Sequence, residues 1–202
     1  MACNSSKTSA DTAKFLCLAP GGGLNPPAMT EKIRKFLDER KPETPCLVVD
    51  LDIVADNYRE LAHALPQADI FYAVKANPAK EVLTTVLALG SNFDTASIFE
   101  IETCLNIGAS PDRIAFGNTV KKARDIAKAY DYGIDLFAFD SRAELSKLKT
   151  EAPGASVFCR IFMDGAGADW PLSRKFGCEP DLAVEMLCDA AESGLKPAGV
   201  SF

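Results

Sequence analysis

The sequence predicts an α/β fold of the (β/α)-barrel kind, in which parallel strands alternate with helices. Short β-rich runs and helical patterns alternate from Pro45 onward. The predicted strands end 19 to 24 residues apart, near Lys75, Asp94, Phe116, Asp140 and Arg160. That spacing is typical of successive βα units, and polar residues stand at several strand ends, where the active sites of barrels lie.

A doubly wound sheet is the rival fold, and it requires a glycine-rich turn after an early strand. The turns after the first two predicted strands are Asp50-Leu51-Asp52 and Lys75-Ala76-Asn77, which contain no glycine. A barrel is therefore favoured. A complete barrel takes ~250 residues, so we expect an incomplete one with about six of the eight βα units, from a truncated gene or a fragment.

Apolar spacing and chain-breaking residues place the elements in order. Strands are expected at 47–50, 70–74, 92–94, 113–116, 134–139, 156–162 and from 198. Helices are expected at 30–37, 54–65, 82–87, 101–105, 123–130, 145–148 and from Pro180, because proline suits an early helical position. The last helix is expected to turn Val184, Leu187, Cys188 and Ala191 toward the core.

The first 28 residues differ from the rest in composition. They are rich in Ser and Thr, contain a Gly-Gly-Gly run and two adjacent prolines, and their apolar run at 15–19 is too short for a signal-peptide core. We expect residues 1–28 to be a disordered extension and residues 29–202 to be the partial barrel domain. We also expect Met29 to be the natural first residue.

The composition narrows the function classes. The formal net charge is −6 and no basic cluster occurs, which argues against a nucleic-acid partner. No apolar run approaches the ~18 residues of a membrane span. The 7 cysteines are scattered without a CxxC pair and the single histidine is His63, so a metal site is not expected. Scattered thiols of this kind are typical of a cytoplasmic protein.

Lys75 is the first candidate for chemistry. The strand-forming run Phe71-Tyr72-Ala73-Val74 ends in this lysine, and Asn77-Pro78 then ends the element. We expect the strand to place the ammonium among carbon side chains, where desolvation favours the neutral amine. A neutral amine can attack a carbonyl, as a Schiff-base lysine does.

Other polar residues have structural alternatives. Asp94 could be a turn residue, and Arg160 could form a salt bridge at a strand end. Ser97 and Glu100 form a capping-box pattern, which explains Glu100 as well as a direct role does. Capping is taken as the whole explanation of Ser141 and Glu144. Surface solvation is the expected state of Arg174 and Lys175, and His63 is expected to be a surface or partly buried side chain with no chemistry.

Several sequence blocks together resemble one family, the fold-type III pyridoxal-phosphate decarboxylases of ornithine, lysine, arginine or diaminopimelate. The block at 72–78, YAVKANP, is similar to the lysine motif that holds the cofactor. Further blocks resemble the family at 93–97 (FDTAS) with Glu100, 116–122 (FGNTVKK), 137–141 (FAFDS), 160–161 (RI) and 172–177 (LSRKFG). The resemblance covers residues 42–202 and is strongest to the ornithine decarboxylases.

The resemblance implies a fold and a set of site residues. The fold would be the alanine racemase-like (β/α)8 barrel, without the family's C-terminal β-domain. Lys75 would hold pyridoxal 5'-phosphate covalently, and Asp94 would lie beneath the cofactor near Lys75. Glu100 would belong to the same polar cluster, Arg160 would approach the cofactor ring, and Ala73 would line the cofactor floor.

The resemblance also implies a reaction and partners. The substrate would be a basic amino acid, with ornithine giving putrescine in polyamine biosynthesis, and full-length members of the family form homodimers. Decarboxylation of lysine or diaminopimelate is an alternative. A second alternative is a non-catalytic remnant that binds or regulates a full-length relative. Whether the 202 residues are active alone is left open.

Overall fold

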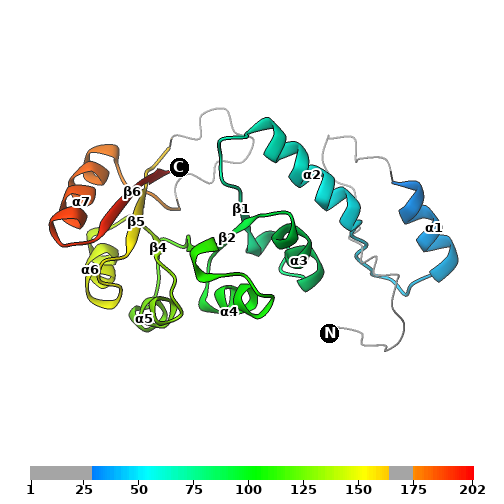
Figure 1. Ribbon diagram of the computed structural model, residues 1–202, viewed down its shortest axis with the longest axis horizontal. Coiled ribbons are helices and arrows are strands. Elements are labelled where there is room, and N and C mark those ends of the chain that lie inside the picture. Colours follow the sequence, from blue (N-terminus) through cyan, green and yellow to red (C-terminus); the bar gives the residue numbers. More distant parts are fainter. Residues whose placement is uncertain (1–28, 164–174) are drawn as a thin grey trace. The chain divides into compact units, whose positions relative to one another are not determined.

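The computed structural model describes residues 29–163 and 175–202 (Figure 1). The chain divides into two compact units, Met1–Ala64 and Leu65–Phe202. The predicted extension at 1–28 and the segment 164–174, which includes Arg174, lie outside the described residues.

The described part of the first unit contains two helices, α1 (Glu31–Arg40) and α2 (Leu51–Ala64). The side chain of Thr30 caps α1 by accepting a hydrogen bond from the backbone N–H of Ile33 at 3.2 Å. The strand expected at 47–50 is wrong, because only Val48 makes a single bridge there. His63 is exposed in the last turn of α2, as expected.

The second unit is a six-stranded parallel sheet. Its strands are β1 (Phe71–Ala73), β2 (Asn92–Thr95), β3 (Ile114–Phe116), β4 (Leu136–Phe139), β5 (Ser156–Arg160) and β6 (Lys196–Ser201). They follow one another in chain order across the sheet. A doubly wound sheet reverses its strand order part-way, so the observed order supports the preference for the barrel type of connection.

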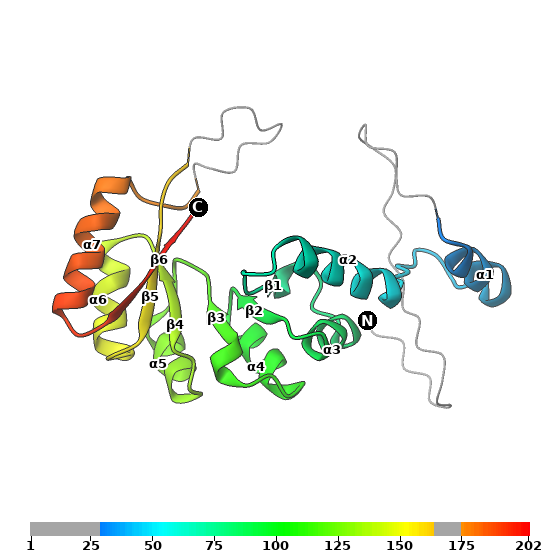
Figure 2. The same ribbon diagram turned by 45° about the horizontal axis from the view of Figure 1, so that its top comes forward.

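A helix follows each of the first five strands. These helices are α3 (Lys80–Ala88), α4 (Ile98–Asn106), α5 (Ala123–Asp131), α6 (Arg142–Glu151) and α7 (Pro180–Glu192). Crossovers between parallel strands are right-handed, so sequential strands bring every connecting helix to one face of the sheet (Figure 2). The second unit is therefore α/β, as the sequence predicts.

The core of this unit lies between the sheet and its helices. In β2, Phe93 and Thr95 are buried, whereas Asn92 and Asp94 are half-buried. In β5, Val157 is buried, and Arg160 on the opposite parity is half-buried. Because side chains alternate between the two faces of a strand, the helix-covered face takes the apolar residues. Asp94 and Arg160 are left on the other face.

Strand register brings further site residues to that second face. Ala73 of β1 pairs with Asp94 of β2, and Asp94 pairs with Ala115 of β3. Residues paired in register on neighbouring strands point to the same side of a sheet. Ala73 and Ala115 therefore flank Asp94 with small side chains.

The core face expected for α7 is wrong. Its buried residues are Ala183, Met186 and Ala190, whereas Val184 and Cys188 are exposed. Both sets fit a helical period, and the sequence contains apolar residues on two adjacent stripes. Packing against β5 and β6 selects the stripe with two alanines, whose small side chains permit a close approach.

Candidate functional site

Lys75 lies in a single turn of 3-10 helix, Val74–Ala76, directly after β1. The strand ends at Ala73, earlier than expected, and Val74 is buried while Lys75 is exposed. The expectation that carbon side chains surround Lys75 is therefore wrong. The turn changes the direction of the chain, so Lys75 leaves the strand and its side chain can meet a ligand from solvent.

The pKa of the Asp94 carboxyl depends on several of the other candidate site residues. Burial raises the pKa of its carboxyl above the ordinary value, and Lys75 opposes that rise. Glu100 raises the pKa further, and Arg160 lowers it. Charges act in this way only over short distances. Three of the residues expected from the sequence thus act electrostatically on Asp94, and Ala73 lies beside Asp94 in register.

Gly117, at the end of β3, leaves the space that Asp94 occupies. A Cβ atom on Gly117 would lie 1.7 Å from Oδ1 of Asp94, which no side chain could tolerate. The backbone N–H of Gly117 donates a hydrogen bond to the carbonyl of Thr95 at 2.9 Å. Residue 117 was included in the family-like block without a role, and only the three-dimensional contact reveals it.

Glu100 has the structural role that its capping pattern predicts. The Ser97 hydroxyl accepts a hydrogen bond from the backbone N–H of Glu100 at 3.3 Å. Oε2 of Glu100 accepts one from the backbone N–H of Ala96 at 2.7 Å. The same carboxylate still acts on Asp94, so Glu100 both caps α4 and contributes negative charge to the site.

Arg160 ends β5 and is held in place by the chain that returns after residue 174. Its guanidinium lies over the ring of Phe176, 5.6 Å from the ring centre. Gly177 has φ +102°, and a Cβ there would meet the backbone of Ile161 and Phe162 at 2.7 Å. Asp140 accepts a hydrogen bond from the backbone N–H of Gly177 at 3.0 Å. The sequence alone indicates no role for Phe176, Gly177 or Asp140.

Lys175, expected to be solvated, is exposed, and its ammonium lies 5.2 Å from the ring centre of Phe176. Lys175 and Arg160 therefore share one aromatic neighbour. Of these two cations, Arg160 also acts on the carboxylate of Asp94, whose pKa it lowers.

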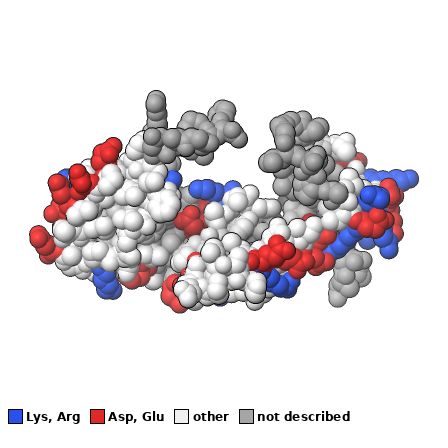
Figure 3. All heavy atoms as spheres, turned by 90° about the horizontal axis from the view of Figure 1, so that it is seen from above, with Lys and Arg blue, Asp and Glu red and all other residues white. Residues whose placement is uncertain are grey.

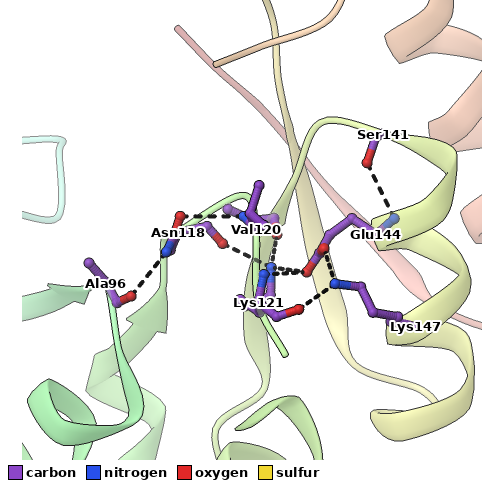
Figure 4. A network of polar contacts seen from close by, with 8 residues as sticks. Ala96, Asn118, Val120, Lys121, Ser141, Glu144 and Lys147 are labelled. Atoms are coloured by element: carbon purple, nitrogen blue, oxygen red, sulfur yellow. Dashed lines mark hydrogen bonds and ion pairs between the residues drawn. The ribbon is translucent and has the colours of Figure 1, made fainter. Parts of the chain in front are cut away.

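A buried ion pair joins the loop after β3 to α6 and corrects one expectation (Figure 4). Ser141 does cap α6, because its hydroxyl accepts from the N–H of Glu144 at 3.3 Å. Capping is not the whole explanation, however. The Glu144 carboxylate binds the ammonium of Lys121 at 2.9 Å, with side chains 3% and 0% exposed. Glu144 also pairs with Lys147 at 2.5 Å.

These residues fit a cofactor with an aldehyde and an anionic group. Lys75 provides an accessible amine, and Arg160 and Lys175 provide cations. Ala73 and Ala115 flank Asp94 with small side chains. A half-buried carboxylate between cations can stabilise a positive charge on a ligand that covers it. Pyridoxal phosphate combines these properties.

A comparison with protein families identifies the domain. The model for the pyridoxal-binding domain of pyridoxal-dependent decarboxylases matches residues 51–202. The chain belongs to this family. The resemblance found in the sequence blocks is thereby confirmed, and the family's cofactor is pyridoxal phosphate.

Curated relatives in the family decarboxylate basic amino acids. The lysine/ornithine decarboxylase of Selenomonas ruminantium is 39% identical over 174 residues, which are 86% of this chain and 44% of that protein. The chloroplastic ornithine decarboxylase of Nicotiana glauca is 39% identical over 84% of this chain and 39% of its own length. The chain thus spans less than half the length of these relatives.

Solved structures of relatives have the same fold. A mutant of the Selenomonas ruminantium lysine decarboxylase in complex with pyridoxal phosphate superposes with a TM-score of 0.77 at 38% identity, covering 85% of this chain and 44% of that one. The arginine decarboxylase of a Paramecium bursaria Chlorella virus, bound to agmatine, gives 0.72 at 36% identity, covering 75% and 42%. The six strands and their helices therefore match the N-terminal part of a decarboxylase barrel domain.

The surface and the helices add two observations. Basic and acidic side chains are interspersed on the face shown in Figure 3, without a broad basic area. Among the described residues, none of the helices has the length and apolar character needed to cross a membrane.

Proposed function

We propose that this chain holds pyridoxal phosphate on Lys75 and belongs to a decarboxylase that converts ornithine to putrescine. The observation that carries the proposal is the placement of Lys75, Asp94 and Arg160 at or beside the carboxyl ends of β1, β2 and β5, where both cations lower the pKa of the Asp94 carboxyl. Three separate strand ends contribute these residues.

Each residue has a part in the proposed reaction. Lys75 would hold the cofactor through its aldehyde, and its amine, when free, would carry a proton to or from the reacting carbon. Asp94 would stabilise positive charge on the bound ligand, and Arg160, at the end of β5, would help to orient it. When bound, pyridoxal phosphate supplies the electron sink for the pair of electrons left by departing carbon dioxide.

Ornithine is proposed as the substrate because the blocks at 93–97 and 116–122 resemble the ornithine decarboxylases most. Lysine remains an alternative, since the Selenomonas ruminantium relative is named for both substrates, and diaminopimelate is a third. The same proposal assigns residues 29–202 to a partial barrel domain, a homodimer to the whole protein, and the cytoplasm as its compartment.

The test combines a spectrum with an assay. The chain is mixed with pyridoxal phosphate, and the absorbance band of a lysine adduct is followed in wild type, Lys75→Ala and Lys80→Ala. Lys80 is an exposed lysine in the first turn of α3 and serves as the matched control. We expect the band in wild type and Lys80→Ala, and its loss in Lys75→Ala.

Release of carbon dioxide from carboxyl-labelled ornithine, lysine and diaminopimelate is then measured. Preferred turnover of ornithine supports the substrate assignment, and preferred turnover of either other amino acid contradicts it. An adduct band without release from any of the three supports cofactor capture by a non-catalytic chain. A folded wild-type chain with no band contradicts the cofactor assignment itself.

A further inference from the structure

The ammonium of Lys121 is buried and fully hydrogen-bonded. It donates to the backbone carbonyls of Asn118 at 2.9 Å and Ala138 at 2.5 Å, and it pairs with Glu144 at 2.9 Å. A lysine ammonium has three donors, so these acceptors satisfy all of them. The ammonium also lies 5.7 Å from the ring centre of Phe116.

These contacts tie three elements to one nitrogen. Asn118 belongs to the loop after β3, Ala138 belongs to β4, and Glu144 belongs to the first turn of α6. Glu144 adds a second tie, since Oε1 accepts a hydrogen bond from the backbone N–H of Lys121 at 3.2 Å. Lys147 closes the network by donating to the carbonyl of Lys121 (Figure 4).

The loop held by Lys121 is the one that touches Asp94. Gly117 begins it, with its α-carbon against the Asp94 carboxylate. The side chain of Asn118 continues it by donating to the carbonyl of Ala96, two residues beyond Asp94, at 3.2 Å. The loop therefore packs against the end of β2 at Asp94 and Ala96.

We infer that Lys121 is a positioning residue for the cofactor site, which holds the 117–121 loop against Asp94 and keeps that carboxylate shielded beside Lys75 and Arg160. This inference rests on the proposed function for its purpose, although the contact itself does not require a ligand. A buried ion pair contributes little net stability. The three contacts of the Lys121 ammonium instead hold the 117–121 loop in one position.

The hydrogen bonds of Lys121 also explain why another residue could not replace it. The amine must reach two backbone carbonyls and a carboxylate that come from different directions. Arginine presents its donors in a rigid planar fork, and methionine has no donor. A methionine at position 121 fills similar space while releasing the Asn118 carbonyl and the loop.

The experiment measures the pKa of Asp94 by carboxyl NMR in wild type, Lys121→Met and Lys122→Met, without cofactor. Lys122 is the neighbouring, exposed lysine and controls for the loss of one positive charge. We expect the Asp94 pKa to fall in Lys121→Met, because water enters as the loop moves away. Loss of a nearby positive charge alone would move this pKa upward, so the direction separates positioning from charge.

Amide resonances of Gly117 should shift in the same variant and remain in place in Lys122→Met. An unchanged or raised Asp94 pKa in a folded Lys121→Met chain overturns the inference, and so does an equal fall in both variants. If Lys121→Met does not fold, Lys121→Met combined with Glu144→Gln removes both buried charges, and the same criteria apply.

A second readout links the inference to the cofactor. Borohydride reduction of the chain with pyridoxal phosphate should trap several-fold less adduct in Lys121→Met than in Lys122→Met. Equal trapping in the two variants contradicts a positioning role in cofactor binding. If wild type traps none while the Asp94 pKa still falls, the loop inference stands and the proposed function fails.

Discussion

The Asp94 carboxylate occupies the space that a side chain on Gly117 would fill, with only 1.7 Å between Oδ1 and the position of a Cβ. The ends of β2 and β3 are therefore packed closely against each other at this point. The backbone of Gly117, directly after β3, lies against the Asp94 carboxylate of β2. This contact determines where negative charge lies relative to Lys75.

Gly117→Ala should displace Asp94 and disturb the site. Overpacking of this kind costs about 1–3 kcal/mol of unfolding free energy. The fraction of chains that trap cofactor on Lys75 should also fall. Chemical denaturation and borohydride trapping measure the two effects. Gly154→Ala is the control, since Gly154 has φ +81° with nothing within 4 Å of its Cβ position. It should lose stability through backbone strain and retain trapping.

Asp94→Asn should stabilise the folded chain and abolish its chemistry. Burial raises the pKa of Asp94, so the ionised carboxylate costs free energy as the pH rises through that folded pKa. The asparagine variant should therefore gain stability at neutral pH and show little gain below the ordinary carboxyl pKa. Thermal unfolding at several pH values checks this. A loss of stability at neutral pH would mean that Lys75 and Arg160 outweigh the desolvation.

Thr119→Val should raise the free energy of unfolding. The Thr119 hydroxyl is buried and finds no hydrogen-bond partner within the part of the chain that the structure describes. An unsatisfied buried polar group costs about 1–3 kcal/mol, and valine has nearly the same shape. Urea unfolding measures the gain, with Thr119→Ser, which keeps the hydroxyl, for comparison. Lower stability of Thr119→Val would show that the hydroxyl has a partner.

Lys121→Met should change how stability depends on alkaline pH. Burial lowers the pKa of Lys121 from 10.5 to about 8, against the opposing effect of Glu144. Between these values the unfolded chain binds a proton that the folded chain does not, so the unfolding free energy rises with pH. Methionine removes this contribution. The difference curve between wild type and variant should rise from pH 8 to 10.5 in favour of wild type, and a flat curve would contradict it.

The sequence predicts the fold well because the βα rhythm is a repeated local signal. Five successive strand ends near Lys75, Asp94, Phe116, Asp140 and Arg160 lie at or within two residues of the observed ends. The exact ends and the helix faces are less accessible. The apolar stripes of α7 differ by one residue, and only the packing surface of β5 and β6 selects between them.

The positions of the candidate site residues were predictable where they follow a strand end, and less so where they depend on contact. Lys75, Asp94 and Arg160 could be named from position and resemblance. The burial of Lys75 could not be judged, because a 3-10 turn replaces the last strand residue. Gly117 contacts Asp94 on the neighbouring strand, and Lys121 pairs with Glu144, 23 residues further along the chain. No local sequence pattern indicates either contact.

The central claim is that the amine of Lys75 is the point of covalent attachment for pyridoxal phosphate. Borohydride reduction of the chain with pyridoxal phosphate, followed by peptide mass mapping, tests it most directly. The account predicts one dominant pyridoxyl-lysine at position 75, and its loss in Lys75→Ala. Reduction spread over many exposed lysines, with no preference for Lys75, would contradict it.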